Sequence, residues 1–123
     1  MDIDQRAHRL YHGDNWSGGL DVFDISTREP KYLQTIRMRG MLYGVSVARN
    51  VNKVFVGLSM SLVAVVDIDP ASPTFHTVIA QVDTGGRGAS ASWVAYDETN
   101  DVMHAAAIAG GKPAPLSFPW PAV

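Results

Sequence analysis

The sequence predicts an all-β protein made of repeated units of short antiparallel strands. The main observation is an internal repeat, in which HRLYHGDNWSGGLDVFDI (8–25) aligns with NKVFVGLSMSLVAVVDI (52–68). Arg9 then falls on Lys53, an offset of 44, and Asp24 falls on Asp67, an offset of 43. A third copy follows, because VSVARNVNKVFV (45–56) aligns with WVAYDETNDVMH (93–104) at an offset of 48. A period of about 40–45 residues is typical of the four-stranded blade of a β-propeller.

The pattern inside each copy indicates strands. Val54 and Val56, like Val63 and Val65, are β-branched residues at alternate positions, and polar turns such as DPASP (69–73) separate the runs. The central unit is predicted to have strands at 43–48, 53–57, 62–68 and 75–82. The first unit has an inner strand from Met1 and strands at 10–12, 20–25 and 32–37. The last unit has two strands, at 90–96 and 101–107.

These strands define a repeat domain over 1–108, with blade one at 1–37, blade two at 41–82 and a half blade at 90–107. The end of the chain, GGKPAPLSFPWPAV, has four prolines in its last eleven residues. Proline cannot donate to a β-ladder, so residues 109–123 are predicted to be an irregular, proline-rich tail without a third strand.

Two segments carry a resemblance to a known family. RLYHGDNWSGGLDVFDI and GVSVARNVNKVFVGLSMSLVAVVDI resemble the YVTN-type β-propeller repeat, which reads as a G-[IV]-x-V strand, a polar turn, a [KR]-[LV]-[YF]-V strand, a small loop and a V-x-V-[IV]-D strand. The tetrapeptide itself is replaced by Leu10-Tyr11-His12-Gly13 in the first copy. The resemblance implies a propeller of about seven blades, so the chain would form about two and a half blades of an incomplete ring.

An incomplete ring leaves blade faces and a strand edge without a neighbour. Blade one would present the face that carries Leu20 and Val22, or its reverse, and the half blade would present Val94 and Val102. Exposed edges and apolar faces favour association. The expected partners are therefore the remaining blades of a larger chain or further copies of this chain.

Composition excludes several classes. The chain has 123 residues, a net charge of −2 and no cysteine, which rules out disulfides and thiolate metal sites. Its charges form no basic patch, so no nucleic-acid partner is expected. The N-terminus is charged from its second residue, and the longest apolar run, 62–66, is far shorter than a membrane span. We expect no signal peptide, membrane contact or cofactor, and the compartment stays open.

The candidate ligand site consists of Arg39, Arg87, Gly88 and Tyr43. The two arginines share one repeat position, each before a glycine that leads into an inner strand. In a propeller this linker borders the central channel, where two guanidinium groups can clamp a carboxylate or phosphate. The alternative is that both are solvated turn arginines or that they pair with acidic turn residues.

The other polar and aromatic residues favour structural roles. The four histidines, His8, His12, His76 and His104, have no metal-ligand spacing and are predicted to be packed or on the surface. Asp24 and Asp67 are predicted to cap the turn after the third strand of their units. Trp16 and Trp93 are expected to be packing residues.

Two classes of function follow. The first is a non-catalytic binding or scaffold propeller, with a small anion or a protein partner at the channel rim. The alternative is a fragment of a propeller enzyme, a lactonase-like hydrolase or a quinoprotein-like oxidoreductase. That class requires polar ligands where the inner strands begin, and Tyr43, Gly44, Ala91 and Ser92 provide no such ring. The binding class is therefore preferred.

Overall fold

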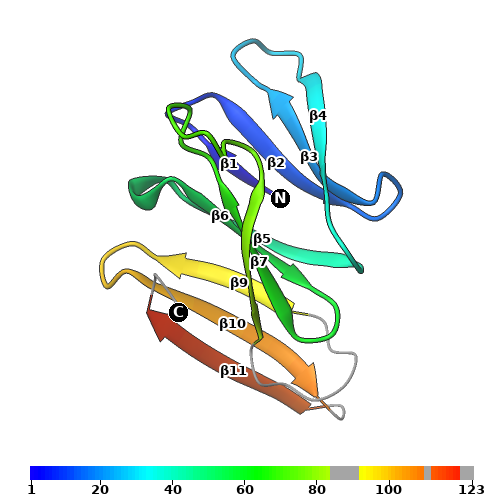
Figure 1. The fold of residues 1–123 in the computed structure, drawn as a ribbon, viewed down its shortest axis with the longest axis vertical. Helices are drawn as coiled ribbons and strands as arrows, with labels where there is room; N and C mark the ends of the chain where they lie inside the picture. The colour runs from blue at the N-terminus through cyan, green and yellow to red at the C-terminus, as the bar shows by residue number, and fades with distance from the viewer. Residues whose placement is uncertain (84–91, 110–111, 120–123) are drawn as a thin grey trace.

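The strands form three antiparallel sheets that follow one another along the chain (Figure 1). The computed structural model describes residues 1–83, 92–109 and 112–119. The first sheet contains β1 (Asp2–Asp4), β2 (Arg9–Asp14), β3 (Gly19–Asp24) and β4 (Lys31–Arg37). The middle sheet contains β5 (Leu42–Ala48), β6 (Lys53–Leu58), β7 (Leu62–Asp67) and β8 (Val78–Asp83). The third sheet contains β9 (Ser92–Asp97), β10 (Val102–Ala109) and β11 (Lys112–Pro119).

Each sheet pairs its strands in chain order, so every connection joins neighbouring strands. The predicted all-β class is confirmed, and so are four antiparallel strands in each of the first two units. A single 3₁₀ turn, Arg49–Val51, joins β5 to β6. The described residues form a stack of three sheets and do not close into a ring. Within these residues, no helix has the length and apolar character needed to cross a membrane.

Two hydrophobic cores lie between successive sheets. The first core joins the first and middle sheets, and its buried residues are Tyr11, Leu20, Val22, Ile36, Leu42, Val54, Val56, Leu58, Ala64, Val66 and Ile68. The second core joins the middle and third sheets through Ala48, Phe55, Val63, Val65, Met103 and Ala105. Since successive side chains of a strand point to opposite faces, β6 and β7 contribute to both cores. The middle sheet is therefore covered on both faces.

Hydrogen bonds hold the first strands of successive sheets together. The backbone N–H of Val47 in β5 donates to Asp2 Oδ2 in β1 at 2.7 Å, and the N–H of Tyr96 in β9 donates to Ser46 Oγ in β5 at 3.0 Å. Between β5 and β9 the chains approach closely at Gly44. A Cβ on that residue would lie 2.8 Å from the backbone nitrogen of Val94. The glycine is thus required by the stacking of two sheets.

The prediction of an irregular tail over 109–123 is wrong for residues 112–119. These residues form β11, which pairs with β10 from Val102↔Pro119 to Ala109↔Lys112. The prolines at 113, 115 and 119 all have odd numbers. In an antiparallel pair only alternate residues direct their N–H toward the partner strand. Because the three prolines all occupy odd-numbered positions of an edge strand, the backbone N–H groups of the even-numbered residues can still donate to the partner strand.

Two further predictions need correction in the described residues. The last strand of the middle sheet begins at Val78, not at Phe75, because residues 74–77 form a turn in which the N–H of His76 donates to Asp67 O at 2.7 Å. Trp16 does not pack, since it lies at the tip of the β2–β3 hairpin and is fully exposed. The N–H of Trp16 donates to Asp14 Oδ1, so its backbone, not its ring, stabilises this turn.

Candidate functional site

The predicted arginine site is described only in part. Arg39 is an exposed residue on the short linker between β4 and β5. It lines a hollow of about 400 Å³ together with Arg37, Met38, Val78 and Gln81. Arg87 and Gly88 lie outside the described residues. The hollow therefore combines Arg39 with Arg37, at the end of β4, which the sequence analysis did not select.

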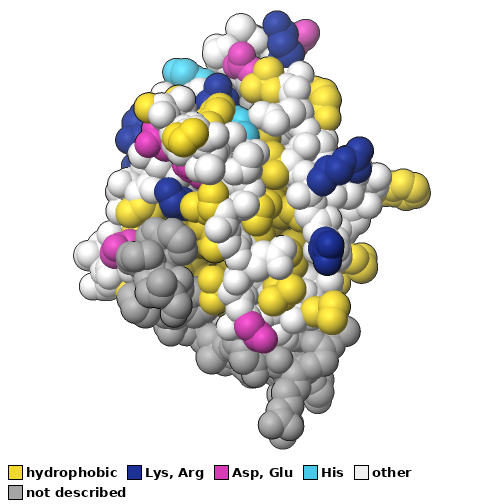
Figure 2. Space-filling view, in the orientation of Figure 1, with side chains coloured by type: hydrophobic (Ala, Val, Ile, Leu, Met, Phe, Trp, Pro, Cys, Tyr) yellow, Lys and Arg dark blue, Asp and Glu magenta, His cyan; other side chains and the backbone are white. Residues whose placement is uncertain are grey.

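The linker that carries Arg39 is held by Ser59. The N–H of Met41 donates to Ser59 Oγ at 3.1 Å, and the N–H of Ser59 donates to Met41 O at 2.9 Å. Gly40 has a φ of +84°, and a Cβ on it would lie 2.5 Å from Ser59 Oγ. A glycine is needed here both for the left-handed conformation and for the close approach. Figure 2 shows basic side chains at the right-hand edge of the molecule, where Figure 1 places the end of β4 and this linker.

Tyr43 has a different environment from Arg39. Its ring lies edge-on to the ring of Trp93, with the centroids 5.9 Å apart, and its hydroxyl donates to Met41 Sδ at 3.9 Å. These contacts place Tyr43 in the packing between β5 and β9. The structure does not bring Tyr43 into the hollow beside Arg39.

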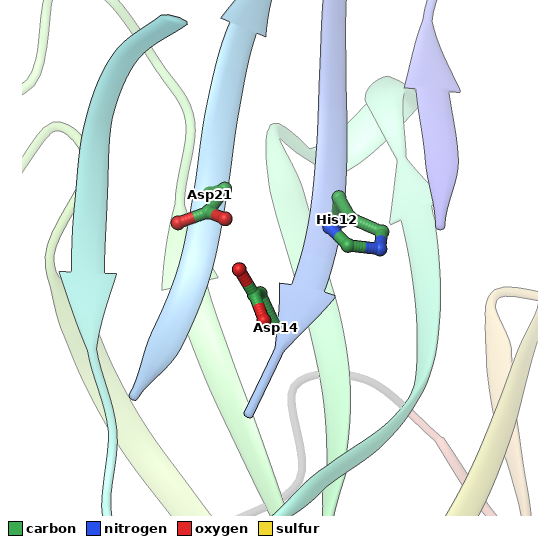
Figure 3. Close-up of side chains that lie close together, drawn as sticks. All are labelled: His12, Asp14 and Asp21. Carbon is green, nitrogen blue, oxygen red and sulfur yellow. The ribbon is translucent and has the colours of Figure 1, made fainter. Parts of the chain in front are cut away.

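A second polar group lies on the open face of the first sheet, the face opposite the first core. His12, Asp14 and Asp21 each offer a ligand atom, and these atoms all lie within 4.8 Å of one another. Figure 3 shows the three side chains on one side of β2 and β3, with the Asp14 carboxylate directed toward Asp21. The strands explain the arrangement, because His12 and Asp14 are two residues apart and Asp21 is the cross-strand partner of His12.

Asp21 is buried, with 6% of its surface exposed. The hydroxyls of Ser17 and Thr35 both donate to its Oδ1, at 2.9 and 2.6 Å. Asp14 is more open, and the hydrogen bond from the N–H of Trp16 is the main cause that lowers its pKa. In the part of the chain that the structure describes, neither carboxylate forms an ion pair with lysine or arginine. The carboxylates of Asp14 and Asp21 therefore lie close together beside the imidazole of His12.

The sequence analysis missed this group because it compared His12 only with other histidines. The available signal was His-x-Asp at the end of the predicted strand 10–12, followed by Asp21 in the next predicted strand, 20–25. The repeat provided a second signal. Offsets of 44 and 43 place buried apolar residues of the middle sheet at the three equivalent positions, namely Val56, Leu58 and Ala64.

His76 is packed in the interior, which is one of the two environments predicted for the histidines. Gln34 Nε2 donates to His76 Nδ1 at 2.7 Å, which leaves Nε2–H to donate to the Tyr11 hydroxyl at 3.0 Å. Burial lowers the pKa of His76 to about 4, with a further contribution from the charge of Arg9, while Asp67 acts in the opposite direction. Burial also raises the pKa of Tyr11 to about 12. The ring is thus a neutral hydrogen-bonding element at neutral pH.

The predicted caps at Asp24 and Asp67 are confirmed. The N–H of Ser26 donates to Asp24 Oδ1 at 2.8 Å, and the N–H of Asp69 donates to Asp67 Oδ1 at 2.9 Å. Burial acts to raise the pKa of Asp67. Hydrogen bonds from the hydroxyls of Ser72 and Thr74 and from the Asp69 N–H outweigh this effect and lower the pKa to about 2. Asp67 therefore has a structural role.

No protein-family model and no curated protein matches this chain. The architecture of the described residues places it among all-β proteins built from stacked antiparallel sheets. Its function has to be argued from its own residues.

Proposed function

We propose that this chain is a segment of a non-catalytic binding β-propeller and that it binds a small carboxylate or phosphate in the hollow between β4 and β8. Three features support the propeller. The sequence repeats with a period in the forties, each repeat corresponds to one antiparallel meander, and successive meanders stack face to face. Stacked four-stranded meanders are the building units of propellers.

The anion site is supported by the lining of the hollow. Arg37 and Arg39 both border it, and among the described residues neither arginine forms an ion pair. Gln81 adds an amide, while Met38 and Val78 provide apolar walls. Two guanidinium groups beside one hollow suit an anion, because guanidinium forms charge-assisted, often bidentate hydrogen bonds with carboxylate and phosphate. This pair of unengaged arginines is the observation that carries the proposal.

Calorimetric titration of the full chain with inorganic phosphate and with succinate tests the site. One anion should bind with saturable heat, and the double variant Arg37→Ala/Arg39→Ala should lose at least tenfold in affinity, because each charge-assisted hydrogen bond contributes about 1.5–3 kcal/mol. The control is Arg28→Ala/Lys31→Ala, which also removes two positive charges but does so near the start of β4. The control should bind like the wild type. Absence of saturable heat at 5 mM of either anion, or equal losses in both double variants, would contradict the proposal.

A further inference from the structure

The geometry points to a metal site on the open face of the first sheet, where His12, Asp14 and Asp21 bind a divalent transition-metal ion such as zinc. This site is separate from the hollow of the proposed function. An imidazole nitrogen and two carboxylate oxygens are ligands that zinc accepts, and three protein ligands leave coordination positions for water or a ligand.

The first argument is distance. The three ligand atoms lie within 4.8 Å of one another. Around one tetrahedral zinc ion, donor atoms about 2.0–2.1 Å from the metal lie about 3.3 Å apart. Zinc binding at this site therefore requires side-chain rotations that bring the ligand atoms closer together. The backbone that carries the ligands is a regular hairpin, with His12↔Asp21 and Asp14↔Gly19 as paired positions.

The second argument is the state of Asp21. Its side chain is more than nine-tenths buried, and both hydroxyl donors contact the same oxygen, Oδ1. The Asp14 carboxyl is a further side-chain hydrogen-bonding neighbour of Asp21. Hydroxyl donors that hold one oxygen of a carboxylate fix its orientation, as such hydrogen bonds do for metal ligands.

The third argument comes from the repeat. The equivalent positions of the middle sheet hold Val56, Leu58 and Ala64, which are buried in the first core. On this open face of the first sheet, the same three positions all hold metal-ligating residue types. His104, the repeat equivalent of His12 on β10 at an offset of 92 (44 plus 48), lies 3.9 Å from Asp97. His104 therefore provides a matched histidine beside Asp97 on another sheet.

The test is calorimetric titration of the metal-free full chain with zinc chloride, with magnesium and calcium chloride for comparison. We expect one zinc site, at least tenfold preference over magnesium and calcium, and a rise in melting temperature with zinc. His12→Ala and Asp14→Asn should each weaken zinc binding at least tenfold, whereas His104→Ala should leave it within twofold. Cobalt absorption bands should report bound nitrogen and oxygen ligands and disappear in His12→Ala.

Asp14→Asn also separates metal binding from folding. Asparagine keeps an oxygen that accepts from the Trp16 N–H and removes one of two adjacent negative charges, so the metal-free variant should melt no lower than the wild type. No saturable zinc binding at 1 mM would overturn the inference. Zinc binding that survives in both His12→Ala and Asp14→Asn, or that is lost equally in His104→Ala, would overturn it as well.

Discussion

At the scale of single residues, side chains that resemble one another in the sequence have different roles because their surroundings differ. Of the four histidines, only His76 is buried; His12 lies beside two carboxylates, and His8 and His104 are exposed. The aspartates divide in the same way. Asp67 caps a turn and accepts hydrogen bonds at both oxygens, whereas Asp21 accepts from two hydroxyls at Oδ1 and lies beside Asp14 and His12. The burial and the partners of each residue decide its chemistry.

Acidification should destabilise the protein through His76. Its pKa is about 4 in the folded chain, compared with an ordinary value of 6.5. Between these values the unfolded chain binds more protons, so the stabilising contribution is present above pH 6.5 and is lost as the pH falls toward 4. A shift of this size corresponds to at most about 3 kcal/mol. The free energies of unfolding of the wild type and of His76→Asn, measured in urea from pH 7 to pH 4, should therefore converge at low pH.

The control for this experiment is His8→Asn. His8 has a φ of 55°, close to the 60° of His76, but its side chain is exposed. Asparagine tolerates this left-handed backbone, and Asn52 already occupies the repeat-equivalent position, at an offset of 44, with the same φ. The His8→Asn stability curve should stay parallel to the wild type. If the His76→Asn curve is parallel as well, His76 does not carry the pH dependence.

At the scale of the strands, two requirements act on each element. A strand has to pair with its neighbours in the sheet, and it has to fit the sheet stacked on it. β6 meets the second requirement with apolar residues on both faces, whereas β5 meets it with Gly44 and Ser46 where it approaches β9. The glycine at the start of the G-[IV]-x-V pattern thus has a packing reason in this unit.

Substitution of Gly44 by alanine should destabilise the fold. The new Cβ would meet backbone atoms of Trp93 and Val94 at 2.8–3.0 Å, and backbone cannot move aside as a flexible side chain can. Overpacking of this kind costs about 1–3 kcal/mol, measured as a lower urea midpoint. Gly13→Ala is the control, since its nearest neighbour is the Leu42 side chain at 3.2 Å. Equal stability of Gly44→Ala and wild type would mean that the two strands do not approach so closely in solution.

At the scale of the whole molecule, the two ends of the stack differ. The open face of the first sheet carries the polar group of His12, Asp14 and Asp21. Leu20 and Val22, on the reverse side, are completely buried by the middle sheet. The open face of the third sheet carries the cross-strand pair Ala95↔His104. Trp93 packs its ring edge-on to Tyr43 of the middle sheet, as predicted for a packing residue, but it remains 52% exposed.

Self-association should therefore occur through the third sheet. Burial of the exposed apolar area of Trp93 and Ala95 contributes about 25 cal/mol per Å², which favours a dimer or a larger assembly. Sedimentation at tens of micromolar should give a mass above the 13.3 kDa of one chain. Ala95→Lys should shift the protein toward the monomer, whereas Ile3→Lys, at an exposed position in the first sheet, should not. A compact wild-type monomer at all concentrations would contradict this prediction.

The sequence by itself determined the repeat, the strand character and most strand positions, because hydrophobic alternation and turn residues are local signals. It also determined the caps at Asp24 and Asp67, which depend on residues within a few positions. The tail was predicted incorrectly because four prolines indicate a break in the chain, and their phase relative to a partner strand becomes visible only once β10 and β11 pair.

Only the tertiary structure decided how the side chains meet across strands and sheets. It grouped Arg39 with Arg37 instead of Tyr43, buried His76 between Tyr11 and Gln34, and brought Asp21 opposite His12. These neighbours are set by register and by the stacking of sheets, which join residues far apart in the chain. The physical reason is that local patterns specify which face of a strand is apolar, whereas the chemistry of a polar group depends on what the fold places against it.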